Sequence, residues 1–131
     1  MQFKSFFLRG LRGTLRLLNG VHFSYAGPWV TVGQNTVLDS WYIGDFSSAD
    51  YTITLDQGAY SREIIKCLVV AGPESASLTV YGQTYLDSNL VTISATVDNS
   101  RVYLTASPVS GVCKAIFSAN YYQATNPITT L

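Results

Sequence analysis

The stretch Asp50-Tyr51-Thr52-Ile53-Thr54-Leu55-Asp56 decides the fold class of this chain. Large apolar side chains alternate here with threonines, so a strand would carry Tyr51, Ile53 and Leu55 on one face and hydroxyl groups on the other. This pattern is typical of a strand in an antiparallel sheet that is buried on one side only. Gln57-Gly58 follows directly and predicts a turn.

The same period of two continues on both sides of this stretch. Apolar or alternating runs bounded by turn residues predict further strands at 36–43, 62–71, 77–85, 90–97, 101–107 and 112–119. Gly82 lies inside one of these runs and predicts a β-bulge. Because no helical pattern separates the strands, we predict an all-β fold. The expected form is an antiparallel β-sandwich of about seven to eight strands, jelly-roll or immunoglobulin-like, with an N-terminal arm.

Composition describes a neutral chain that is poor in charge. Of the 131 residues 12% are charged, against roughly 25% in an average protein, and 47% are hydrophobic. This excludes intrinsic disorder, and zero net charge gives no general argument for nucleic-acid binding. The outward strand positions carry Thr and Ser in place of Lys and Glu, which favours a subunit whose faces meet other proteins. The predicted division is an arm at 1–27, a sandwich domain at 28–122 and a tail at 123–131.

The zero net charge hides a split between the arm and the rest of the chain. The first 16 residues hold four basic groups and no acid, so their charge of +4 is balanced by −4 elsewhere. Apolar residues recur at helical spacing from Phe3 to Leu18, although three glycines weaken a helix. We therefore expect a short amphipathic helix or an irregular arm that contacts a neighbouring subunit. The predicted contact residues are Phe3, Phe6, Phe7, Arg9, Leu11, Arg12 and Arg16.

Two other interpretations of the arm stay open: weak attachment to nucleic acid, or an ordinary first strand folded onto the same domain. Arg9, Arg12 and Arg16 interrupt any apolar run, so we expect neither a secretory signal nor a membrane span. Partner proteins are favoured over nucleic acid because apolar residues outnumber charges in the arm.

Side chains with catalytic or metal-binding chemistry are few. His22 is the single histidine, and neither Cys67 nor Cys113 has a second cysteine or a histidine at zinc spacing. Each cysteine lies in an apolar strand pattern, so both are predicted to be buried free thiols, with a disulfide left open. Solvated turn acids are expected at Asp45, Asp50 and Asp56. We therefore predict no enzyme activity, no metal and no cofactor.

Tyrosines offer a second kind of surface. Stacking against sugar rings is one use of exposed tyrosines, and packing in cores and interfaces is the other. The candidate glycan contacts are Tyr42, Tyr60, Tyr81 and Tyr85.

Several short motifs follow one another between residues 39 and 108. They are Asp39-Ser40-Trp41, Ser47-Ser48-Ala49-Asp50-Tyr51-Thr52-Ile53, Glu63-Ile64-Ile65, Tyr81-Gly82, Leu90-Val91-Thr92-Ile93-Ser94-Ala95 and Val102-Tyr103-Leu104-Thr105-Ala106-Ser107-Pro108. Together they resemble a β-sandwich module of virion structural proteins from T4-like marine cyanophages. Such modules usually carry an HDGT-like turn after the third strand, where this chain has Gly72-Pro73-Glu74-Ser75. The resemblance implies a particle component without catalysis.

We therefore expect a non-enzymatic structural component of a phage virion, either decorating the capsid or attached to the neck or tail. Its partners would be other virion proteins, capsid or neck/tail subunits, and further copies of itself, with no membrane. The alternative is a receptor- or glycan-binding module of a tail fibre or capsid surface.

Overall fold

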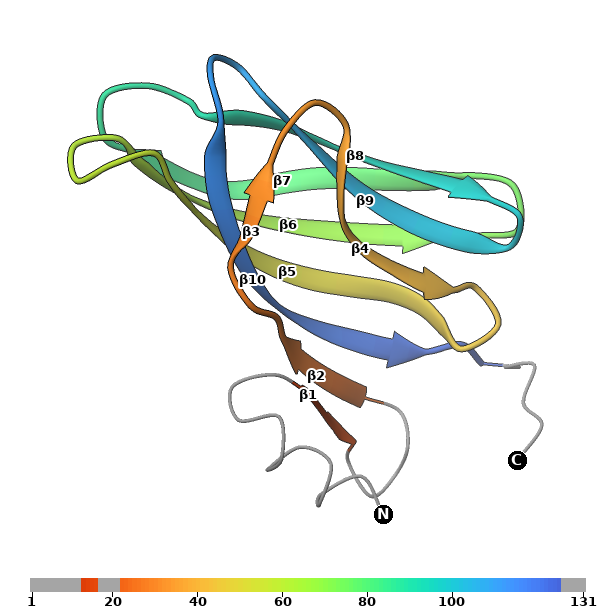
Figure 1. The fold of residues 1–131 in the computed structure, drawn as a ribbon. Helices are drawn as coiled ribbons and strands as arrows, with labels where there is room; N and C mark the ends of the chain where they lie inside the picture. Colours follow the sequence, from red (N-terminus) through yellow and green to blue (C-terminus); the bar gives the residue numbers. More distant parts are fainter. Residues whose placement is uncertain (1–12, 17–21, 126–131) are drawn as a thin grey trace.

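The computed structural model describes residues 13–16 and 22–125, with side chains from residue 27 onward, and all regular elements in these ranges are strands (Figure 1). In chain order they are β1 (Gly13–Arg16), β2 (His22–Ala26), β3 (Val30–Val32), β4 (Thr36–Tyr42), β5 (Phe46–Asp56), β6 (Arg62–Ala71), β7 (Ala76–Tyr85), β8 (Val91–Asp98), β9 (Arg101–Pro108) and β10 (Cys113–Gln123). Within these ranges no helix is long and apolar enough to cross a membrane.

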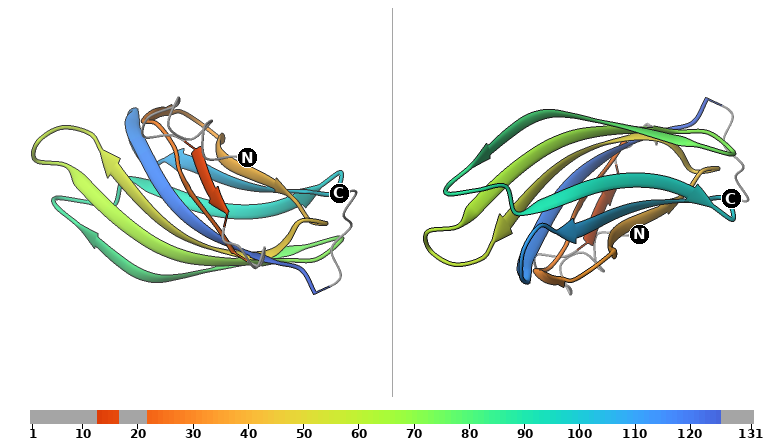
Figure 2. Two further views of the ribbon diagram at one scale, coloured as in Figure 1. Left: turned by 90° about the horizontal axis from the view of Figure 1, so that it is seen from below. Right: turned by 90° about the horizontal axis from the view of Figure 1, so that it is seen from above.

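The strands form two antiparallel sheets that face each other as separate layers (Figures 1 and 2). The larger sheet has the order β1-β2-β10-β5-β6-β7, with β3 also paired to β10. The smaller sheet has the order β4-β9-β8. From β3 onward, five strands therefore lie in the larger sheet and three in the smaller one, which confirms the predicted antiparallel β-sandwich.

The core lies between the sheets and follows from the period of two. Along β6, exposed and buried residues alternate from Arg62 to Val70, and Ile65, Cys67 and Val69 point inward. Side chains from the smaller sheet meet them. The largest fully buried ones in the core as a whole are Tyr51, Ile53, Leu55, Ile65, Leu104, Val32, Val69, Val102 and Cys67.

The predicted buried thiols are confirmed, since Cys67 and Cys113 are both buried and free. Burial raises the pKa of Cys67 to about 11 and also raises the pKa of Cys113. Both thiols are therefore protonated at neutral pH and behave as small hydrophobic groups.

Turn chemistry explains the tightest connection. Asn99 and Ser100 both have positive φ, 51° and 67°, between the paired residues Asp98 and Arg101. Two central residues with positive φ define a type I′ turn, whose twist matches that of the flanking strands. Gly58 adopts φ of 129° in the turn after β5, which a residue with a Cβ would adopt only under strain.

The N-terminal segment departs from the prediction. Residues 13–16 and 22–26 form strands, and β2 pairs with β10 from Ser118 to Tyr122. For these residues the predicted helix or irregular arm is wrong, and the alternative of a strand in the same sheet is correct. The backbone of β10 from Ser118 to Tyr122 offers hydrogen-bonding groups to β2. A helix interrupted by glycines would be less stable than this pairing. The predicted domain boundaries at residues 27 and 122 remain predictions.

Candidate functional site

Residues of the first two motifs meet between the sheets around Asp39. The indole Nε1 of Trp41 donates to the Tyr51 hydroxyl at 2.9 Å, and that hydroxyl donates to Asp39 Oδ2 at 2.7 Å. Tyr121 donates to the same carboxylate oxygen at 2.6 Å. The hydrogen bonds join β4 of the smaller sheet to β5 and β10 of the larger one. We call Asp39, Trp41, Tyr51 and Tyr121 the inter-sheet cluster.

The electrostatics of the inter-sheet cluster suit a structural role. Burial raises the pKa of Asp39 above its ordinary value, and the hydrogen bonds from Tyr121 and Tyr51 lower it only in part. Burial, with the charge of Asp39, also raises the pKa of Tyr51 far above its ordinary value. The tyrosine hydroxyl therefore remains a donor at neutral pH. Trp41 and Tyr121 also pack edge to face, with ring centroids 6.4 Å apart.

The buried acid Glu63 holds the segment in which the chain crosses from one sheet to the other. It is only 3% exposed. Its Oε2 accepts from Gln83 at 2.6 Å and from Asn89 at 2.7 Å, and its Oε1 accepts from the backbone N–H of Leu90 at 2.7 Å. These partners lie on β7 and in the segment before β8, where the chain crosses to the smaller sheet. Glu63 is therefore fully engaged in holding that crossing.

Of the three acids predicted to lie near turns, Asp45 lies in the turn between β4 and β5, where its backbone N–H donates to the Tyr42 carbonyl at 3.0 Å. Asp56 pairs with Arg62 at 3.3 Å and caps the turn by accepting from the N–H of Gly58 at 2.8 Å. Asp50 lies inside β5, not in a turn, because the strand begins at Phe46. Among the described residues no three His, Cys, Asp or Glu side chains gather as a metal site requires.

The larger sheet turns an outer face away from the core, formed by β10, β5, β6 and β7. Its cross-strand rows are Lys114–Asp56–Arg62, Ile116–Thr54–Ile64–Thr84, Ser118–Thr52–Lys66–Gly82, Asn120–Asp50–Leu68–Thr79 and Tyr122–Ser48–Val70–Ser77. On the central strand β6, Ile64, Leu68 and Val70 are 43%, 47% and 55% exposed. We call this surface the outer face. Its middle three rows and its last row carry only two charged side chains, Asp50 and Lys66.

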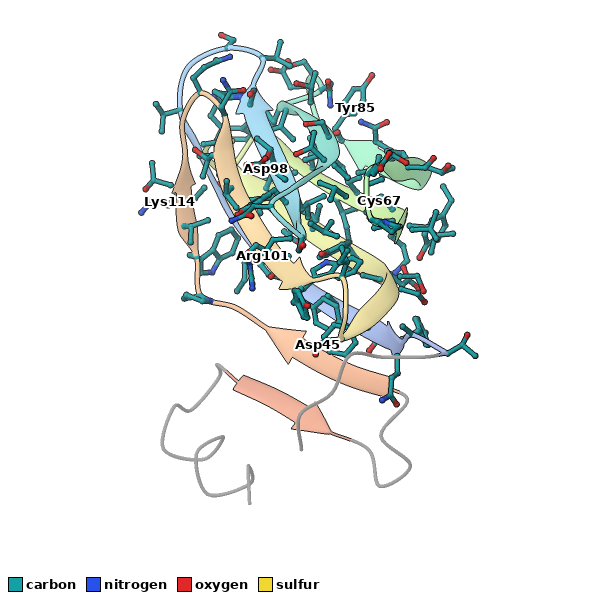
Figure 3. The ribbon with its side chains drawn as sticks, turned by 90° about the vertical axis from the view of Figure 1, so that its right-hand side faces the viewer. Asp45, Cys67, Tyr85, Asp98, Arg101 and Lys114 are labelled. Carbon is teal, nitrogen blue, oxygen red and sulfur yellow. The ribbon has the colours of Figure 1, made fainter. Side chains whose placement is uncertain are left out.

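Two hollows lie at opposite ends of the sandwich strands. The first, about 420 Å³, is floored by Leu68 and Val70 and bordered by Ser48, Thr79 and Tyr122. The second, about 630 Å³, lies between β3, the turn after β5 and the start of β10. Figure 3 labels Cys67, which is buried in the core, and Lys114, which lines the second hollow.

The second hollow contains a residue that sequence reasoning missed. Trp29 is 49% exposed beside Gln57, Val112 and Lys114. The amide Nε2 of Gln57 donates to the carbonyls of Ser110 at 2.7 Å and Val112 at 3.2 Å, which fixes the side chain. A tryptophan outside any strong strand pattern, directly after Gly-Pro, was the available signal.

The four candidate glycan tyrosines do not come together. Lys66 pairs with Gly82 and Cys67 with Val80, so Tyr81 is the extra residue of a bulge, as Gly82 predicted. The Tyr81 hydroxyl donates to Asp50 Oδ1 at 2.7 Å on the outer face, which raises the pKa of Tyr81.

The other three tyrosines lie elsewhere. Tyr85 is in register with the buried Glu63 and so stands on the opposite side of β7 from Tyr81. Tyr60 is 88% exposed in the turn after β5, and Tyr42 ends β4 in the smaller sheet. Of the predicted arm contacts, Phe3, Phe6, Phe7, Arg9, Leu11 and Arg12 lie outside the described residues, and Arg16 ends β1.

No protein-family model matches the chain, and no curated protein sequence matches it. Among solved structures, one similar protein is the tailspike protein gp49 of Acinetobacter baumannii bacteriophage Fri1, a capsular polysaccharide depolymerase. The TM-score is 0.44 at 7% identity, over 88% of this chain and 20% of that one. Another is the tailspike of Acinetobacter phage vB_ApiP_P1, with a TM-score of 0.34 at 12% identity, over 86% of this chain and 23% of that one. The chain is thus distantly similar in structure to phage tailspikes and spans about a fifth of their length.

Proposed function

We propose that this chain is a non-enzymatic β-sandwich component of a phage virion that docks onto other particle proteins through the outer face. The observation that carries the proposal is the outward row of β6, where Ile64, Leu68 and Val70 are each about half exposed on a central strand. Central strands of isolated sandwiches usually carry polar side chains on their solvent side. Three exposed apolar residues beside Lys66 on β6, framed by hydroxyl groups on β5 and β7, match the composition of a protein interface.

The use of the acids supports the non-enzymatic part of the proposal. Asp39 and Glu63, the two acids that reach the interior, have their oxygens engaged in hydrogen bonds that hold the sheets. The sequence motifs around them resemble a virion structural module. The proposed particle position is the capsid surface or the neck and tail, in several copies, with the N-terminal residues from Phe3 to Arg16 adding contacts.

Incorporation into particles tests this proposal. Leu68→Asp places a charge in the middle of the outer face and should reduce the amount of tagged protein that copurifies with particles from infected cells. Val109→Asp is the matched control, because Val109 is 58% exposed in the loop after β9. Normal incorporation of Leu68→Asp, with both variants folded by circular dichroism, would contradict docking through the outer face.

Glycan recognition is the second candidate, and the hollow beside Trp29 favours it over the four dispersed tyrosines. An exposed indole can stack on a sugar ring, and the fixed Gln57 and the Lys114 ammonium can hydrogen-bond its hydroxyls. A glycan array with the intact chain tests this. Specific binding that Trp29→Ala abolishes and Tyr60→Ala retains supports the second candidate, whereas an empty array contradicts it.

A further inference from the structure

We infer that the outer face binds a second copy of this chain, giving a two-fold symmetric dimer in which the larger sheets stack. This inference rests on the proposed docking function and names the partner.

The outer face is self-complementary in its apolar and hydroxyl groups. The row Ile116–Thr54–Ile64–Thr84 and the row Tyr122–Ser48–Val70–Ser77 show the same order, apolar then hydroxyl, on strands β10, β5, β6 and β7. Consider a two-fold axis that lies in the interface and crosses the strands midway between these rows. It places each row over the other row of the second copy, strand over equivalent strand. Ile64 then faces Val70 of the other copy and Thr54 faces Ser48, twice.

The two charges inside these rows, Asp50 and Lys66, lie diagonally on neighbouring strands and form no ion pair with each other. Asp56–Arg62 is the one ion pair in the part of the chain that the structure describes. Asp50 instead accepts from the Tyr81 hydroxyl, and the Lys66 Nζ donates to Thr52 Oγ1 at 2.8 Å. Both charges are thus held in place on a face of apolar and hydroxyl side chains. A partner that places a cation near Asp50 and an anion near Lys66 would complement both charges as it covers this face.

The same two-fold axis supplies both. Asp50 lies one row from Thr52 on β5, and the axis passes between these two rows, so Asp50 of one copy stands over Thr52 of the other. The Lys66 ammonium is tethered to that threonine hydroxyl. Each Asp50 therefore meets the ammonium of the other copy's Lys66, and the pair forms twice. Stacked sheets lie about 10 Å apart, a separation that these two side chains can bridge together.

The charged row Lys114–Asp56–Arg62 meets no charged row across the axis, because the pair beyond Tyr122–Ser48 is Gln123–Phe46, after a register shift. It would form a solvated rim, as charged residues do at protein interfaces. Two charge pairs beside the axis, a row of apolar and hydroxyl groups on each side of them and a charged rim describe an interface of one chain with itself.

Charge reversal in the full-length chain tests the inference. Asp50→Lys brings two lysines together at each pair and Lys66→Asp brings two acids together, so each variant alone should weaken dimerisation on the order of 10- to 100-fold in sedimentation velocity. An equimolar mixture of the two variants restores both opposite-charge pairs and should recover the dimer. Asp98→Lys and Arg101→Asp, on the β8–β9 hairpin of the smaller sheet, are the controls and should dimerise like the unmodified chain.

Two outcomes would overturn the inference: a chain that stays monomeric at every concentration, or a mixture of folded Asp50→Lys and Lys66→Asp variants that stays monomeric while each control dimerises. Particle incorporation separates this failure from that of the proposed function. If the unmodified chain is monomeric but Leu68→Asp is still excluded from particles, the outer face docks on a different virion protein. If the chain dimerises but Leu68→Asp incorporates normally, the docking function fails and the dimer stands.

Discussion

Two aspartates of this molecule accept hydrogen bonds of nearly equal length from tyrosines in different environments. Asp39 accepts from Tyr51 at 2.7 Å and from Tyr121 at 2.6 Å between the sheets, whereas Asp50 accepts from Tyr81 at 2.7 Å on the outer face. Both aspartates are half-buried, but their donors differ: Tyr51 and Tyr121 are buried, whereas Tyr81 is 48% exposed. Removing the acceptor of buried donors strands them in an apolar environment, while water replaces the acceptor beside an exposed donor. The comparison assigns Asp39 to stability, whereas the role of Asp50 is the proposed association.

The largest expected effect is the loss of Asp39. Asp39→Ala leaves two tyrosine hydroxyls without their acceptor and should lower the free energy of unfolding by about 2–4 kcal/mol. Asp50→Ala should change it by no more than about 0.5 kcal/mol. Urea unfolding at pH 7, followed by tryptophan fluorescence, measures both. Equal losses in the two variants would break the comparison.

Glu63 extends the comparison to an acid that is itself buried. Glu63→Ala removes the acceptor for the Leu90 N–H, Gln83 and Asn89, and should cost about 1–3 kcal/mol by loosening the crossing between the sheets. Glu74→Ala, in the exposed turn between β6 and β7, is the matched control and should be close to neutral. Thermal unfolding of both variants gives the difference, and a neutral Glu63→Ala would remove the structural role.

The pH dependence should be the smallest effect. The pKa of Asp39 is raised in the folded chain, so the folded state binds this proton more tightly than the unfolded state. The stabilising contribution is full below the ordinary aspartate pKa and is lost as pH rises through the raised pKa, by about 1.4 kcal/mol for each unit of the difference.

Comparison with an uncharged residue isolates this contribution. Asp39→Asn keeps an acceptor oxygen for the two tyrosines but has no proton to exchange. Urea unfolding between pH 4 and pH 7 should therefore show less loss of stability with rising pH in Asp39→Asn than in the unmodified chain. Identical pH profiles would contradict the raised pKa.

Much of the sandwich could be predicted because it depends on local alternation. The strand predicted at 62–71 coincides with β6, and its alternation of buried and exposed residues follows from the period of two. β5 begins at Phe46, earlier than predicted, although Ser47 and Ser48 are typical of turns: Ser48 is paired on both sides, and Ser47 lies at a register shift beside it. The pairing of β2 with β10 depends on which edge of the sheet is open to it, and alternation alone cannot reveal this.

The candidate site was less predictable because it depends on contacts that are distant in sequence. Tyr121 reaches Asp39 from 82 positions away, and the connection requires the relative position of two sheets. A regular strand would have kept Tyr81 and Tyr85 on one side of β7. The bulge, which Gly82 predicted, places them on opposite sides. The low charge of the outward positions predicts a face that meets protein, which stays a prediction, and it did not identify the exposed apolar residues of β6.

Methyl-selective NMR of the unmodified chain, recorded as its concentration is raised, tests the central claim most directly. We predict that the methyl signals of Ile64, Leu68 and Val70 shift or broaden with concentration. The methyl signals of Val37 and Val109, which are equally exposed on the smaller sheet and its loop, should stay constant. Shifts confined to Val37 and Val109, or no shift at any of the five residues, would contradict an association surface on the outer face.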